Sequence, residues 1–164
     1  MSRSSRATVG DAWRVQYATA EEVRRFDIVP RVIDLTKPPP PGVLLSADGF
    51  TTASDVAGKP GLLARRAGAT AALRVNVSQL CVIGFLRSWA DEMGEAFAYL
   101  DGEKAGGVTL PGWWAKQVSI YQTAELGLGA LAPGEHTLHV EVRAREGARS
   151  GGAAKFKLLE VVQF

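Results

Sequence analysis

The chain has 164 residues, enough for one domain with a sizeable core, and its 46% hydrophobic against 22% charged residues predict a mostly globular protein. Nineteen basic residues nearly balance seventeen acidic ones, and this even balance gives no argument for a nucleic-acid partner. No apolar stretch is long enough to span a membrane, and a single cysteine excludes an internal disulfide framework.

Residues 1–42 are predicted to form an N-terminal arm. Residues 1–10 are rich in Ser and Arg without periodicity, which indicates disorder, and no apolar segment of a secretory signal follows them. The protein is therefore expected to be intracellular, or else a fragment of a secreted protein whose signal lies elsewhere. Thr19 and Glu22 have capping-box spacing, which predicts a short helix over 19–26. The proline run 38–41 is interpreted as an extended spacer before the main domain, residues 43–164.

From Val43 onward, short apolar or alternating segments are separated by turn residues. Strands are expected at 43–46, 62–64, 73–77, 80–86, 97–100, 102–109, 118–121, 138–142 and 156–164, with a short edge strand or docking segment at 32–35. About eight strands at this spacing, with little helix, predict an all-β fold, an antiparallel β-sandwich of the jelly-roll type.

The stretch 80–101 is predicted to organise this sandwich. The apolar run Leu80–Leu86 indicates a strand buried on both faces, with Cys81 as a buried, inert thiol. A polar connection, residues 87–94, leads to a second strand that ends at the turn pair Asp101-Gly102. Together they are interpreted as a core hairpin.

Catalytic motifs are missing from the sequence. It holds no Gly-x-Ser-x-Gly elbow, no P-loop and no dinucleotide-binding Gly-x-Gly-x-x-Gly, so we expect the chain not to be an enzyme. His136 and His139 would point to opposite faces of a strand, and with no third ligand nearby a zinc site is not expected. The basic residues near the C-terminal end are interpreted as solvated; they are Arg143, Arg145, Arg149, Lys155 and Lys157.

The connection 87–94 is the main candidate for function. Its acids Asp91 and Glu92, with Glu95 behind them, allow a carboxylate pair or a structural calcium site, but no cofactor is otherwise expected. Exposed tryptophans stack on sugar rings or anchor protein interfaces. Trp89 lies in this polar connection, and the adjacent Trp113 and Trp114 must point opposite ways if the chain there is extended.

Several segments in this order resemble a galactose-binding-like β-sandwich module attached to plant and algal SGNH (GDSL-type) esterase-like and related proteins. They are GKPGLLA (58–64), FLRSW and MGEA (within 85–96), a Trp before a strand (113 or 114), LAPGEHTLHVEV (131–142) and KFKL (155–158). The resemblance covers residues 43–164 and implies an accessory domain without the SGNH catalytic residues. Trp89 stands where the family pattern has Tyr. The acidic residue of the family pattern corresponds to either Asp91 or Glu92 in this sequence.

These observations predict a non-catalytic module that binds carbohydrate or another ligand, with no nucleic-acid partner. The expected ligand-binding residues are Arg87, Trp89, Asp91, Glu92, Trp113 and Trp114. The alternative is a structural or assembly protein whose arm and sandwich surface dock on a protein partner. The oligomeric state is left open.

Overall fold

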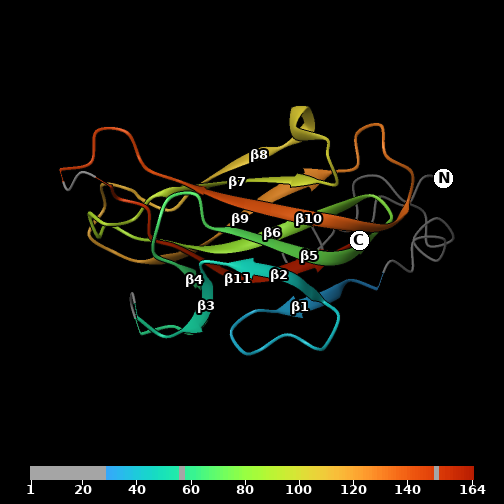
Figure 1. Ribbon diagram of the computed structural model, residues 1–164, viewed down its shortest axis with the longest axis horizontal. Helices are drawn as coiled ribbons and strands as arrows, with labels where there is room; N and C mark the ends of the chain where they lie inside the picture. Colours follow the sequence, from blue (N-terminus) through green and yellow to red (C-terminus); the bar gives the residue numbers. More distant parts are fainter. Residues whose placement is uncertain (1–28, 56–57, 150–151) are drawn as a thin grey trace, which may run out of the picture.

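The computed structural model describes residues 29–55, 58–149 and 152–164, which form a sandwich of two antiparallel β-sheets (Figure 1). Sheet A has the order β3-β4-β11-β6-β9, and β1 pairs with the second half of β11. Its strands are β1 (Arg31–Asp34), β3 (Phe50–Ala53), β4 (Gly61–Ala64), β6 (Leu80–Arg87), β9 (Ile120–Gly127) and β11 (Phe156–Gln163). The expected all-β sandwich is confirmed.

Sheet B has the order β2-β5-β10-β7-β8. Its strands are β2 (Leu44–Asp48), β5 (Thr70–Val77), β7 (Glu95–Leu100), β8 (Val108–Pro111) and β10 (Gly134–Arg143). A short 3-10 turn, η1 (Lys104–Gly106), precedes β8, in a stretch where the sequence suggested a weak strand over 102–109. Within the described ranges no helix is long and apolar enough to cross a membrane.

The core lies between the sheets because the central strands alternate buried and outward-facing residues. On β10, Leu138 and Val140 are fully buried, as their alternation with polar residues predicts. Phe85 of β6 and Phe156 of β11 stack with ring centroids 5.7 Å apart. Cys81 is also buried, and burial raises the pKa of its thiol to about 12, as expected for an inert cysteine.

The expected hairpin over residues 80–101 is wrong. β6 lies in sheet A between β11 and β9, whereas β7 lies in sheet B between β10 and β8. The connection 88–94 therefore crosses from one sheet to the other. Packed sheets lie about 10 Å apart, which is the distance that this connection spans. A strand has the same pattern of buried residues whether it pairs with the strand before it or crosses to the facing sheet. The sequence pattern therefore cannot distinguish a hairpin from a crossing connection.

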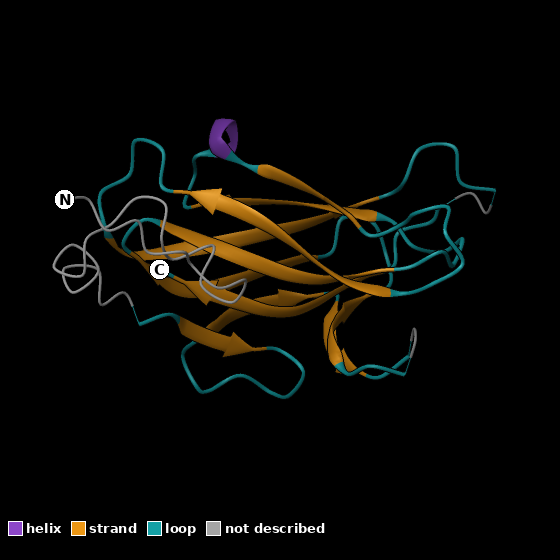
Figure 2. Cartoon of the chain, turned by 180° about the vertical axis from the view of Figure 1, so that it is seen from behind, coloured by secondary structure: helices purple, strands orange, loops and turns teal. Residues whose placement is uncertain are grey.

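Loops gather at the two ends of the sandwich (Figures 1 and 2). Three of them lie at the end drawn at the left of Figure 1, and we call them the rim loops: residues 88–94, residues 112–119, and the described parts of the β10–β11 connection, 144–149 and 152–155. The opposite end holds the turn at residue 101, η1 and the loop 128–133.

The N-terminal predictions are only partly covered by the described residues. The helix over 19–26 and the disorder of 1–10 lie outside them. β1 pairs with β11 and Leu35 is buried in the core, so residues 31–35 belong to the sandwich, although they were predicted to lie in the arm. The boundary at residue 42 and the spacer role of the prolines stay predictions.

Candidate functional site

The rim loops are locked together through their backbones. Ser88 N donates to Gly112 O (2.8 Å), and Gly112 N donates to Gly94 O (3.0 Å). Gly94 N donates in turn to Lys155 O, and Lys155 N to Glu92 O, both at 2.9 Å. Loops that are distant in sequence are thus joined by paired main-chain groups, which holds this end of the sandwich in a defined shape before any ligand arrives.

Arg145 reinforces this frame from the β10–β11 loop. Its Nη2 donates to Asp91 Oδ1 at 2.9 Å and to Asp91 O at 3.1 Å, and its Nε donates to Met93 O at 3.2 Å. The guanidinium also lies 4.2 Å from the centroid of the Trp113 ring. With only 16% of its side chain exposed, Arg145 is a structural clamp on the loop 88–94.

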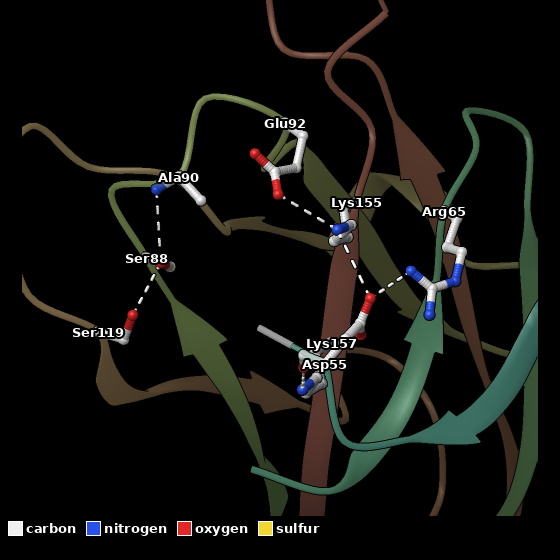
Figure 3. Close-up of polar contacts among 8 residues, drawn as sticks. All are labelled: Asp55, Arg65, Ser88, Ala90, Glu92, Ser119, Lys155 and Lys157. Carbon is white, nitrogen blue, oxygen red and sulfur yellow. Dashed lines mark hydrogen bonds and ion pairs between the residues drawn. The ribbon is translucent and has the colours of Figure 1, made fainter. Parts of the chain in front are cut away.

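A chain of ion pairs runs beside this clamp (Figure 3). Glu92 Oε1 accepts from Lys155 Nζ at 3.2 Å, and Lys155 lies 3.6 Å from Asp55 Oδ2. Asp55 also pairs with Arg65, which follows β4. The two acids expected at the ligand site, Asp91 and Glu92, therefore each already hold a basic partner.

Lys157 is fully buried on β11. Its stem lies across Gly61, where a Cβ would come within 2.6 Å of the lysine Cγ, and its ammonium donates to the carbonyls of Asp55 and Lys59. Burial lowers the pKa of Lys157. This lysine holds the backbone at Asp55 and Lys59, between β3 and β4, against β11.

The expectation that the C-terminal basic residues are solvated is wrong for Arg145, Lys155 and Lys157, whose side chains are largely or fully buried. None of the three was predicted to be part of the rim. The available signal was the Lys-Phe-Lys order at 155–157, in which charged residues flank a core phenylalanine.

The three rim tryptophans have different environments. Trp89 is 52% exposed at the surface of the loop 88–94. Trp113 lies against Arg145, while the Trp114 ring has Arg87 and Lys116 within 5.4 Å of its centroid. Trp89 is therefore the rim indole that offers a largely open surface.

Further polar contacts hold the remaining part of the rim. Arg87 Nε donates to Trp113 O at 3.2 Å, and Trp114 Nε1 donates to Val118 O at 2.6 Å. The buried Ser88 shares a hydrogen bond with Ser119, 2.8 Å between hydroxyl oxygens (Figure 3). All six residues predicted from the sequence thus lie in or beside the rim loops, and their roles toward a ligand stay predictions.

Both histidines of the chain lie away from the rim. His139 stacks on Tyr99 on the outer face of sheet B, with centroids 5.0 Å apart. His136 lies at the opposite end of the sandwich, where Nδ1 is 2.8 Å from Asp101 Oδ2 and Nε2 is 2.7 Å from Ala132 O. Across the described ranges, no group of three or more His, Cys, Asp or Glu side chains is placed to hold a metal ion.

His136 predicts a pH dependence of stability. Both ring nitrogens face acceptors, so the imidazolium satisfies both, and the hydrogen bond to Asp101 raises the pKa of His136 above its usual value near 6.5. A raised pKa contributes stability that is complete below about pH 6.5 and lost as pH rises through the folded-state value. We expect the free energy of unfolding, measured by urea titration, to fall above that pH.

Two variants test whether His136 causes this pH dependence of stability. His136→Gln should flatten the pH dependence above about pH 6.5, whereas His139→Gln, which leaves the contact with Asp101 intact, should retain it. Equal slopes in wild type and His136→Gln would contradict the assignment.

No family model and no curated protein matches this sequence. In structure the chain is similar to a two-domain esterase (CEX) active on acetylated mannans, solved with mannopentaose. The TM-score is 0.61 at 17% identity, over 81% of this chain and 36% of that one. The chain thus spans about a third of that esterase's length.

Two carbohydrate-binding modules also share the fold. A family 6 module from Clostridium cellulolyticum, in complex with xylose, has a TM-score of 0.52 at 14% identity, over 80% of this chain and 94% of that one. The CBM36-1 domain of a multidomain xylanase from the hindgut metagenome of Trinervitermes trinervoides has a TM-score of 0.52 at 8% identity, over 81% and 94%. The chain has the β-sandwich fold of such modules, and attachment to an SGNH esterase stays a prediction.

Proposed function

We propose that this chain is a non-catalytic carbohydrate-binding module whose rim holds a glycan, with Trp89 as the stacking platform. The observation that carries the proposal is an indole 52% exposed on a loop that Arg145 and backbone hydrogen bonds hold in place. A rigid platform favours binding because little conformational entropy is lost when the ligand docks. The fold shared with carbohydrate-binding modules supports the ligand class.

The other rim residues have supporting roles in this proposal. Arg87 and Lys116, beside the Trp114 ring, supply hydrogen-bond donors for sugar hydroxyls. Asp91 shapes the loop through Arg145, while Glu92, paired with Lys155, keeps acceptor capacity for a sugar hydroxyl.

The surroundings of Ser88, one of the rim serines, support a non-catalytic role. The rim hydroxyl Ser88 is buried and bonded to Ser119, and both histidines of the chain lie elsewhere. Activation of a serine nucleophile requires an adjacent base, which histidine commonly supplies.

Titration calorimetry with soluble cell-wall oligosaccharides, chosen from a glycan array, tests the proposal. Trp89→Ala should weaken binding about tenfold or more, because an exposed stacking platform is removed. Leu45→Ala removes another exposed apolar side chain, on β2, and should leave affinity unchanged. No glycan binding by the wild type, or equal binding by Trp89→Ala, would refute the proposal.

A further inference from the structure

Tyr121 is a second exposed aromatic residue; it lies two residues after the rim loop 112–119, but on a strand rather than in a loop. It lies on β9, where Tyr121, Thr123 and Glu125 face solvent, while Leu126 faces the core. β9 is the edge strand of sheet A, next to β6. Tyr121 therefore belongs to the outer face of a sheet rather than to a loop.

The ring lies flat along the sheet instead of standing away from it. Tyr121 Oη donates to Glu160 Oε1 at 2.5 Å, and Glu160 lies on β11, on the far side of β6. Two strand spacings separate β9 from β11, about 10 Å, so the side chain must reach across the intervening strand. Gly84 of β6 makes this possible, because a Cβ there would lie 2.7 Å from Tyr121 Cε2 and 2.8 Å from Oη.

This arrangement leaves an aromatic surface open to water. The Gly84 backbone supports the ring beneath its outer edge, and 46% of the Tyr121 residue is exposed. Burial and the Glu160 carboxylate raise the pKa of the phenol to about 12, so Tyr121 remains a protonated donor to Glu160 at neutral pH. The ring is held at both ends, by its own strand and by this hydrogen bond.

The surroundings favour hydroxyl groups over negative charge. Glu160 uses one oxygen for Tyr121 and retains acceptor capacity for sugar hydroxyls. Thr123, in register with Gly84, adds an exposed hydroxyl, and Glu125 adds a second carboxylate on the same face. Asp34 of β1, in register with Glu160, is a third, and it is paired with Lys37 at 3.2 Å. These carboxylates disfavour an anionic ligand.

We propose that Tyr121 and Glu160 form a second sugar-binding subsite on the outer face of sheet A, for a neutral pyranose ring. The C–H face of the sugar stacks on the tyrosine ring, and its hydroxyls donate to the Glu160 carboxylate. The choice of a sugar as ligand rests on the proposed function, but the site lies on the outer face of the sheet beside the rim and uses none of the rim-loop residues.

The test follows backbone amide resonances of the full chain during titration with mannopentaose and xylopentaose as neutral probes and an oligogalacturonate as the anionic one. We expect the neutral probes to shift two sets of resonances, one in the rim loops and one around 121–125 and 82–86. Tyr121→Leu keeps an apolar cover over Gly84 and should weaken binding at the sheet about tenfold while the rim still responds. Trp89→Ala should give the opposite pattern.

Each failure has its own signature. Shifts confined to the rim, or unchanged sheet binding in a Tyr121→Leu variant that melts like wild type, overturn the second subsite and leave the rim proposal standing. Sheet resonances that respond only to the oligogalacturonate also overturn it. In the last case the sheet resonances respond to the neutral probes, also in Trp89→Ala, while the rim resonances do not respond. This result supports the second subsite and refutes the proposed function of the rim.

Discussion

Replacing Gly94 by alanine is expected to lower the free energy of unfolding by about 3 kcal/mol or more, at the upper end of the range for overpacking. A Cβ at this position would lie 2.6 Å from Ala154 Cα, 2.7 Å from Arg143 O and 2.8 Å from Ala153 O. All three are backbone atoms, which cannot rotate away as the end of a side chain can. Gly94 cannot shift either, because both its N–H and its carbonyl are bonded to other rim segments.

Chemical denaturation of Gly94→Ala beside Gly106→Ala provides the measurement. Nothing lies within 4 Å of a Cβ at Gly106, so alanine there should leave stability unchanged or raise it by about 0.5 kcal/mol. The rim geometry described above would be wrong if both variants unfolded at the same denaturant concentration as wild type.

Removing the Arg145 side chain should have the second-largest effect, a loss of about 2–3 kcal/mol in the free energy of unfolding. Arg145→Ala deletes the ion pair with Asp91, leaves the carbonyls of Asp91 and Met93 without their donor, and uncovers the Trp113 ring. Arg145→Lys keeps the charge but not the planar fork, so it should recover only part of the loss.

Arg66→Ala is the matched control for Arg145. Arg66 also pairs with a carboxylate, Asp48 at 2.7 Å, but both side chains are more than half exposed. Exposed pairs contribute about 0–1 kcal/mol, so thermal and urea unfolding should change little. Hydrogen exchange of the amides at 91–94 should accelerate in Arg145→Ala alone. If Arg66→Ala destabilised the protein as much as Arg145→Ala, Arg145 would not be a special clamp.

Most strands could be predicted because their cause is local. The alternation of Leu138, Val140 and Val142 with polar residues defines β10 in sequence and in structure. Strands with less regular patterns were predicted less well. The strand expected at 118–121 runs from Ile120 to Gly127 as β9, and the sequence did not predict β3. β3 is a short edge strand with a single buried phenylalanine, Phe50, so it carries too little periodicity to be read.

The loop that carries Trp89 could be predicted from the sequence, whereas the contacts of its acids could not. Tryptophan in a polar connection marked the loop 88–94, and Trp89 is indeed exposed there. The partners of Asp91 and Glu92, however, are Arg145 and Lys155, which follow more than fifty residues later. Only the meeting of the two loops reveals that these acids are engaged.

The sequence by itself determined the fold class, the buried thiol of Cys81 and the loop that carries Trp89, because each follows from local alternation, apolar runs and turn residues. Tertiary structure alone decided that the stretch 80–101 crosses between sheets rather than forming a hairpin. It also decided that Tyr121 lies flat over Gly84. The physical reason is that strand neighbours and ion-pair partners are chosen across the folded chain, and no local period encodes that choice.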